Sequence, residues 1–96
     1  MIKHIVLFNL KSNALNQFDH FAKITKETLS KIHGVQNLSV GLSIRPNARY
    51  KYSIIIEFTD ENLLKDYRAH PIHVKYRDEY FKPAVEEYIS LDYELI

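Results

Sequence analysis

A chain of 96 residues suits a single domain with a small core, which a partner subunit would help to cover. Its composition, 46% hydrophobic and 26% charged, is close to that of globular proteins and excludes a disordered, collagen-like or coiled-coil chain. The formal net charge of +1 is too small to hold a nucleic acid by charge alone, and the absence of cysteine excludes disulfides, catalytic thiolates and iron–sulfur clusters.

The first predicted element is a strand over residues 2–10, with the sequence IKHIVLFNL. Alternation places Ile5 and Leu7 on one face and, on the other face, Ile2, His4, Val6, Phe8 and Leu10. Both faces are apolar, although a domain of two layers covers only one face of its sheet. We therefore expect a second copy of the chain to cover the other face, which makes the protein a homodimer.

This N-terminal segment lacks the small-residue cleavage site of a signal peptide. No stretch of the chain reaches the roughly 18 to 20 apolar residues that span a bilayer. We expect a cytoplasmic protein that binds neither membrane nor nucleic acid.

A helix and a hairpin follow. The helix is predicted by apolar residues at spacings of three and four, with Gly34 as its stop: Leu15, Phe18, Phe21, Ala22, Thr25, Leu29 and Ile32. In the next strand, residues 35–44, the small residues Ser39, Gly41 and Ser43 share one face. Turn residues then lead into an aromatic and β-branched strand over residues 50–59, which predicts a hairpin.

Two helices and a strand complete the chain. Asp60 is predicted to cap a short helix that ends before Pro71, because proline disfavours helix in the residue before it. A second helix begins at Pro71, its apolar pattern extends to Tyr88, and Pro83 should kink it near its middle. A last strand alternates over residues 89–95.

The resulting order, β-α-β-β-α-β, is that of the ferredoxin-like fold, in which two helices cover one face of a four-stranded antiparallel sheet. The predicted class is α+β. No linker, internal repeat or low-complexity segment divides the chain, so we expect one domain over residues 1–96.

The segments IKHIVLFNL, IIIEF, YRAHPIHV and LDYEL, with Gly41 in the second strand, follow one another over nearly the whole chain. Through them the sequence resembles the stress-responsive A/B barrel (Dabb) family. The resemblance implies a ferredoxin-like subunit whose open sheet face packs on its twin to form a dimeric α+β barrel. The family includes stress-associated plant proteins, members similar to polyketide cyclases, and many bacterial proteins of no assigned activity, so the resemblance defines fold better than function.

The resemblance also implies a site at the YRAHPIHV string. In cyclase-like members the histidine that matches His73 acts as a base, with the tyrosine that matches Tyr67 beside it, and the histidine that matches His4 lines the pocket. His4 shares its strand face with Val6 and Phe8, which we expect to contact a small apolar or carbonyl-containing ligand. An imidazole that titrates near neutrality suits removal of a proton from carbon between carbonyls, while a phenol can donate to the developing oxyanion.

The same residues have structural interpretations as well. A histidine next to proline often caps a helix, and Tyr67 can simply fill the core. The cyclases have aromatic residues where this chain has Ala22 and Thr25, which implies a pocket of different shape. His70 and His73 have a spacing that can share a metal ion, but a proline lies between them and no third ligand is evident, so we expect no metal.

Two functions stay open at this point. The first is a homodimeric small-molecule-binding or stress-associated module without turnover. The alternative is a cofactor-free enzyme, a cyclase or isomerase-like lyase, that uses His73 and Tyr67 on a carbonyl substrate; the chain carries no cofactor fingerprint. A monooxygenase or lactone isomerase would rest on fold analogy alone. Charges of alternating sign over residues 75–82 predict an exposed, ion-paired helix face and no site.

Overall fold

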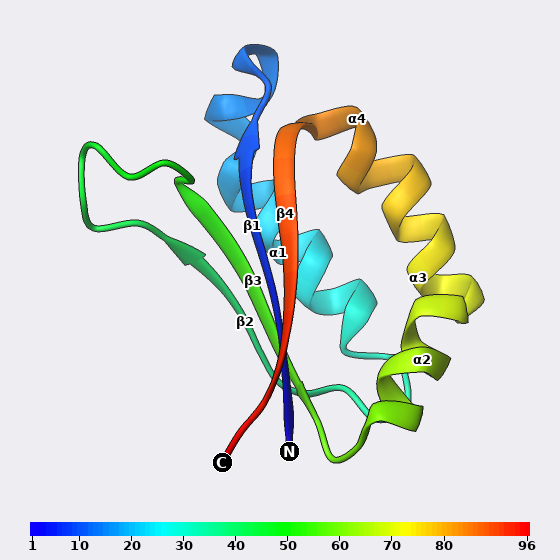
Figure 1. Cartoon of the computed structure of the whole chain (residues 1–96). Helices are drawn as coiled ribbons and strands as arrows, with labels where there is room; N and C mark the ends of the chain where they lie inside the picture. Colours follow the sequence, from blue (N-terminus) through cyan, green and yellow to red (C-terminus); the bar gives the residue numbers. More distant parts are fainter.

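The computed structural model describes residues 1–96 and contains one four-stranded antiparallel sheet (Figure 1). Its strands are β1 (Ile2–Leu10), β2 (Gln36–Leu42), β3 (Tyr52–Phe58) and β4 (Val85–Glu94). They are ordered β2-β3-β1-β4 across the sheet, so the two termini of the chain meet on neighbouring strands. The predicted ferredoxin-like order and α+β class are confirmed.

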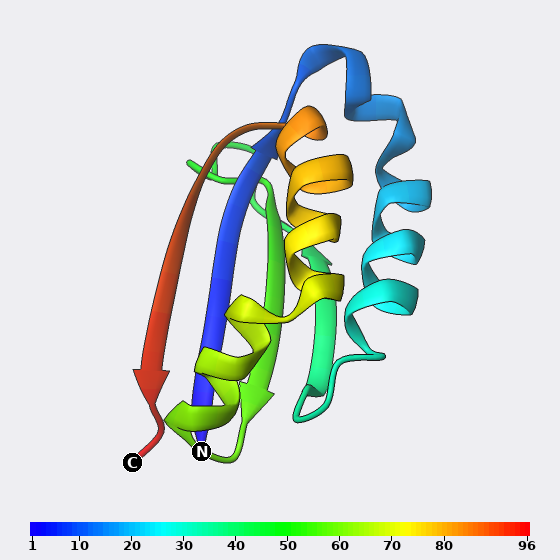
Figure 2. The same cartoon turned by 90° about the vertical axis from the view of Figure 1, so that its right-hand side faces the viewer.

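All the helices lie on one face of this sheet, and the other face is open (Figure 2). The helical segments are η1, a 3-10 helix (Ser12–Gln17), α1 (Phe18–Leu29), α2 (Glu61–Ala69), α3 (Pro71–Tyr76), η2, a π-helical turn (Arg77–Phe81), and α4 (Lys82–Ala84). None of them is long and apolar enough to cross a membrane.

The core lies between the sheet and the helices, and strand alternation creates it. Every second residue of β3 is buried, and β1 contributes Phe8. Phe8, Ile56 and Phe58 have no exposed surface. Burial of each such side chain stabilises the fold by about 1.5–3 kcal/mol before the entropy of ordering it is subtracted.

Local signals set the helix ends. The Asp60 carboxylate accepts a hydrogen bond from the backbone N–H of Leu63 at 3.0 Å and caps α2 as predicted. His70 caps α3 in the same way, because its Nδ1 accepts from the N–H of Ile72 at 3.1 Å. Beyond α1, Gly34 has a φ of +92°, a conformation that a residue with a Cβ rarely adopts.

The predicted second helix is wrong in its extent. Its pattern included Tyr88, but the helix ends at Ala84 and β4 begins at Val85. Pro83 lies near the end of the helix and does not kink its middle. The irregular part is η2, where the N–H of Lys82 donates to the carbonyl of Arg77, five residues back. Pro83 has no N–H with which to continue that ladder, so the helix stops there.

The strand β2 is also shorter than the predicted 35–44. Its pairing with β3 shifts register between Gln36 and Ser39, which inserts one extra residue. Asn37 lies in this bulge with a φ of +50°. Alternation cannot reveal such an interruption, because the residue types on either side of it still fit a strand.

The open face of the sheet contains the apolar residues that the sequence placed there. Ile5 pairs with Ile55 on β3 and with Leu91 on β4, and the next row contains Leu7 with Ser53 and Ile89. Gly41 pairs with Ser53 in that row, so the small residues of β2 lie beside this patch. We call these residues the open-face patch: Ile5, Leu7, Ile55, Ile89 and Leu91.

Candidate functional site

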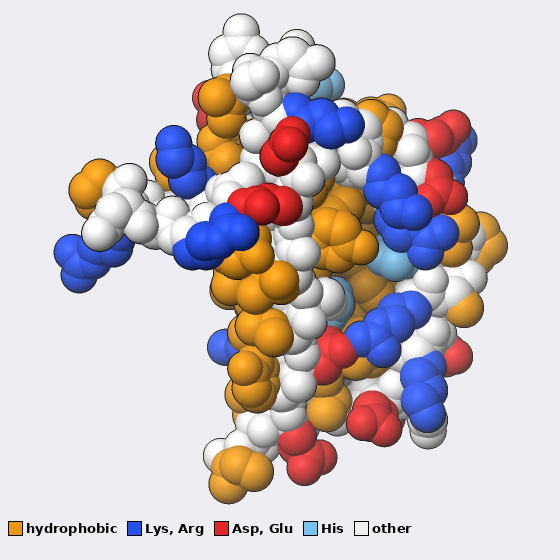
Figure 3. Space-filling view, turned by 45° about the horizontal axis from the view of Figure 1, so that its top comes forward, with side chains coloured by type: hydrophobic (Ala, Val, Ile, Leu, Met, Phe, Trp, Pro, Cys, Tyr) orange, Lys and Arg blue, Asp and Glu red, His pale blue; other side chains and the backbone are white.

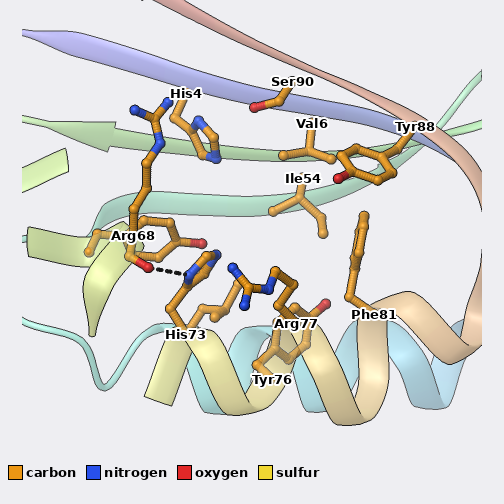
Figure 4. A pocket seen from close by; sticks show the side chains of 12 residues that line it. His4, Val6, Ile54, Arg68, His73, Tyr76, Arg77, Phe81, Tyr88 and Ser90 are labelled. Carbon is orange, nitrogen blue, oxygen red and sulfur yellow. Dashed lines mark hydrogen bonds between the residues drawn. The ribbon is translucent and has the colours of Figure 1, made fainter. Parts of the chain in front are cut away.

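A cavity of about 250 Å³ lies between the helix-facing side of the sheet and the segment from α2 to η2 (Figure 4). Its apolar wall consists of Val6, Leu29, Ile54 and Phe81. Seen in space-filling form, the cavity opens as a hollow in which histidine side chains lie between basic groups (Figure 3).

His73 extends from α3 into this cavity (Figure 4). Its Nδ1 is 3.0 Å from the backbone carbonyl oxygen of Arg68, and because a carbonyl only accepts, Nδ1 is the protonated nitrogen of the neutral ring. Nε2 is therefore left with a lone pair. Burial lowers the pKa of the imidazole; the bond to the carbonyl opposes this effect, and the charge of Arg77 adds to it. A neutral base at physiological pH follows from these interactions.

Tyr67 lies next to His73, with ring centroids 4.5 Å apart, and its other side meets Phe58 at 5.2 Å. The tyrosine also meets the ring of His4 edge-on at 5.8 Å. It is only 3% exposed, and this burial raises the pKa of the phenol well above its ordinary value. The phenol therefore stays protonated and can donate a hydrogen bond into the cavity.

His4 enters the cavity from β1, on the side opposite His73 (Figure 4). Its Nδ1 is 2.6 Å from Oδ1 of Asp92, which pairs with it in register on β4. The other carboxylate oxygen of Asp92 bonds to the guanidinium of Arg68. Because a carboxylate only accepts, Nδ1 donates this hydrogen bond, and Nε2 is the ring nitrogen that Asp92 does not engage. The two imidazoles thus face one cavity with the same nitrogen available.

Of the two apolar residues predicted to contact a ligand, Val6 lines the cavity and Phe8 does not. Phe8 has no exposed surface and packs against Phe81 with ring centroids 5.6 Å apart, so it supports a residue of the wall from behind. Ser90 and Tyr88 of β4 also line the cavity. They alternate with the open-face residues of that strand, so the more polar face of β4 is the one that faces the helices.

Thr25 contacts the cavity lining from behind, through Tyr76. It is fully buried, and its Oγ1 is 2.5 Å from the hydroxyl of Tyr76, which lines the cavity. Burial raises the pKa of the Tyr76 phenol. The predicted difference in shape at Ala22 and Thr25 stays a prediction, but Thr25 acts through Tyr76, without lining the cavity itself.

Two arginines of the site were missed by the sequence analysis. Arg68 follows Tyr67 directly, and Arg77 belongs to the charged stretch that was predicted to be an exposed face. Part of that prediction holds, because Asp78 pairs with Lys82 at 3.7 Å. The sequence signal that could have found them is that one arginine lies on each side of HPIHV. Their positions beside the cavity, however, depend on the bend at Pro71 and on η2.

His70 and His73 do not act together. The Nδ1 of His70 accepts the bond that caps α3, and His73 bonds to Arg68. No group of three or more His, Cys, Asp or Glu side chains in residues 1–96 is placed to share a metal ion. His70 thus has a role in local structure.

The fold and site define a ferredoxin-like α+β subunit with a histidine-lined cavity between its sheet and helices. The sequence matches the Dabb family, the stress responsive A/B barrel domain, over residues 2–95, and the chain belongs to this family. No curated protein matches the chain.

Solved structures agree with this assignment. A Dabb family protein with a ferredoxin-like fold from Mesorhizobium loti is 30% identical, with 99% of this chain and 96% of that one covered and a TM-score of 0.89. A dimeric protein of unknown function from Bacteroides fragilis is 27% identical, with 98% and 95% covered and a TM-score of 0.79. The hydroxynitrile lyase from Passiflora edulis is 19% identical over 99% and 93%, with a TM-score of 0.85, and shares the fold.

Proposed function

We propose that the protein binds a small carbonyl compound in the cavity and removes a proton from the carbon beside the carbonyl, with side chains alone as catalysts. The observation that carries this proposal is His73, whose Nδ1 is held by the Arg68 carbonyl and whose Nε2 faces an apolar-walled cavity beside Tyr67. Of the two functions left open by the sequence, this geometry favours the cofactor-free enzyme.

The proposed step is a proton transfer that needs two groups. Nε2 of His73 takes the proton from carbon, and the electron pair moves onto the carbonyl oxygen to form an enolate. The Tyr67 phenol, kept protonated by its burial, donates a hydrogen bond to that oxygen. A positioned general base of this kind contributes roughly 10²–10⁴-fold to a rate. An enolate formed here can add to a second carbonyl, as in an aldol ring closure, or take the proton back.

His4 has a positioning role in this proposal. Asp92 holds its Nδ1, so the ring cannot turn, and Nε2 can accept a hydrogen bond from a hydroxyl of the ligand. Among proteins of this fold, one is named as a hydroxynitrile lyase, which supports the idea that the fold can contain an acid–base site. The identity to that protein is too low to transfer its substrate.

Deuterium exchange tests the proposal without knowledge of the product. Carbonyl compounds of a size that fits the cavity are incubated with the protein in D₂O, and loss of the proton beside the carbonyl is followed by NMR. We expect the wild type to speed exchange of at least one compound, and His73→Gln to reduce the enhancement by at least 10²-fold. Tyr67→Phe should reduce it by a smaller factor. His33→Gln is the matched control, because His33 is exposed and does not line the cavity.

The outcomes separate the two functions. Exchange that survives in His73→Gln overturns the assignment of the base. Ligands that raise the melting temperature of wild type but not of His73→Gln, with no exchange in either, indicate a binding or stress-associated module without turnover.

We also propose that the protein is a homodimer through the open-face patch. The patch is apolar, lies on the uncovered side of the sheet and is continuous across three strands. Dimeric ferredoxin-like proteins of unknown function from Bacteroides fragilis, Thermobifida fusca and Jannaschia are among the similar structures. Two open faces packed together would form the α+β barrel expected from the sequence.

A further inference from the structure

We propose that the ligand of the cavity carries a carboxylate, which binds between the guanidinium groups of Arg68 and Arg77. This inference rests on the proposed function, because it assigns the substrate class of the same site. The ligand would be a small 2-oxo or 3-oxo carboxylate.

The two arginines lie at the mouth of the cavity, on either side of His73. Their side chains are 49% and 40% exposed, which leaves the charged ends open to a ligand from solvent. Arg68 extends along the wall towards His4, and the guanidinium of Arg77 is directed at His73 (Figure 4). The same part of the surface shows basic groups around the hollow (Figure 3).

Both guanidinium groups retain free donors. Each has five N–H groups in a planar fork. Arg77 uses Nε to bond Asp78 at 3.0 Å, which leaves both terminal nitrogens available, and Arg68 uses one terminal nitrogen for Asp92. The cavity lining contains no carboxylate. The two nearby carboxylates, Asp92 and Asp78, bond to the arginines from outside the lining, so the free donors of both guanidinium groups remain available to an anionic group on the ligand.

The charge balance favours a carboxylate over a phosphate. Arg68 pairs with Asp92, and Arg77 and Lys82 both pair with Asp78, so these three cations and two carboxylates leave one net positive charge, which suits a group with a single negative charge. A carboxylate bound at Arg77 would also bring the acidic carbon of the ligand, C2 of a 3-oxo or C3 of a 2-oxo carboxylate, towards the base, because this guanidinium points towards His73 (Figure 4). Binding and proton removal then use adjacent parts of one small molecule.

Calorimetric titration of matched pairs tests the inference. The panel contains aromatic and short-chain 2-oxo and 3-oxo carboxylates, each beside its methyl ester, and the corresponding aryl phosphates. Arg77→Gln is the main variant, because replacing Arg68 would also release Asp92 and so disturb His4. Arg77→Lys keeps the charge but loses the fork. Arg45→Gln removes the same charge from the exposed hairpin and is the control.

We expect wild type and Arg45→Gln to bind at least one acid ten-fold or more tightly than its ester, and Arg77→Gln to reduce this ratio to below threefold. Arg77→Lys should lie between them. Equal affinity for acid and ester in the wild type, with deuterium exchange that still depends on His73, overturns the inference and leaves the proposed function standing. Tighter binding of the aryl phosphates overturns the choice of carboxylate. If no compound binds in the titration and none exchanges its proton in D₂O, both proposals are overturned.

Discussion

The two histidines of the cavity are each held by a hydrogen bond at Nδ1, although their partners differ. Each has its Nδ1 engaged by an acceptor, a backbone carbonyl for His73 and a carboxylate for His4. In a neutral ring this leaves Nε2 as the basic nitrogen. Burial lowers the pKa of His73, and the charges of Arg77 and Arg68 lower it further. The chemistry of the site is therefore most sensitive to groups around His73.

Titration of His73 should show this influence directly. We expect its NMR-detected pKa to lie below the ordinary value of about 6.5. Arg77→Gln should raise it, because a positive charge that disfavours the imidazolium is removed, whereas Arg45→Gln should leave it unchanged. An unchanged value in Arg77→Gln would contradict the proximity of these two side chains.

The same shift has a consequence for stability. Because the pKa is lowered in the folded state, the unfolded chain binds the proton more tightly between the two pKa values. The contribution of His73 to stability is fully present above about pH 6.5, the ordinary pKa of histidine, and is lost as the pH falls towards the lowered pKa of the folded state. Chemical denaturation of the wild type from pH 7 to pH 5 should show this loss, and His73→Gln should show less of it.

Sequence analysis could find His73 and Tyr67 because the YRAHPIHV string is specific, and His4 because of its place in the first strand, IKHIVLFNL. It could not find the arginines, since charged residues on a helix usually face solvent. It also could not tell that Phe8 supports the wall without lining it, because alternation gives the face of a strand and not the depth at which each side chain lies.

At the scale of elements, α1 and α3 are joined by one buried polar contact, between Thr25 and Tyr76. Replacement of either partner leaves the other hydroxyl without its bond, at a cost of about 1–3 kcal/mol. We expect Thr25→Val and Tyr76→Phe each to lower the free energy of unfolding by this amount. The double variant should lose less than the sum of the two single losses.

Urea denaturation of the four proteins measures this cycle. Additive losses would show that the two hydroxyls do not interact. Ser30→Ala is a suitable comparison, because Ser30 is exposed and its hydroxyl bonds only to the carbonyl of Glu27, at 3.4 Å. It should change the stability little.

The element order and the caps were predictable because each rests on a short-range signal, such as Asp60 three residues before Leu63. The end of the last helix was not. Val85 and Tyr88 fit a helical spacing and a strand equally well, and the deciding feature is η2, which precedes Pro83. A π-helical turn depends on backbone hydrogen bonds across five residues, which residue types do not reveal.

At the scale of the whole molecule, we expect one substitution in the open-face patch to convert the proposed homodimer into monomers. Leu7 lies in the middle of the open-face patch, paired with Ser53 and Ile89. Leu7→Lys would bury a charge in the interface, and we expect it to give monomers. Light scattering at micromolar concentration should show about twice the chain mass of 11.4 kDa for the wild type and the chain mass for the variant.

Ile44→Lys is the matched control, since Ile44 is 86% exposed and lies outside the patch. It should remain dimeric. A wild-type protein that is already monomeric at this concentration would exclude the proposed interface. Circular dichroism of Leu7→Lys should retain the α+β signal, because the helix-facing core does not contain Leu7.

The strand β4 belongs to the cavity and to the open face at once. Ser90 and Asp92 serve the site, while Ile89 and Leu91, their immediate neighbours, lie on the open-face patch. As an edge strand it is held by β1 alone, so fraying of β4 removes a wall of the site together with two of the five residues of the open-face patch. In the proposed homodimer, a ligand that orders this strand would therefore favour self-association, and by thermodynamic reciprocity self-association would strengthen ligand binding by the same factor.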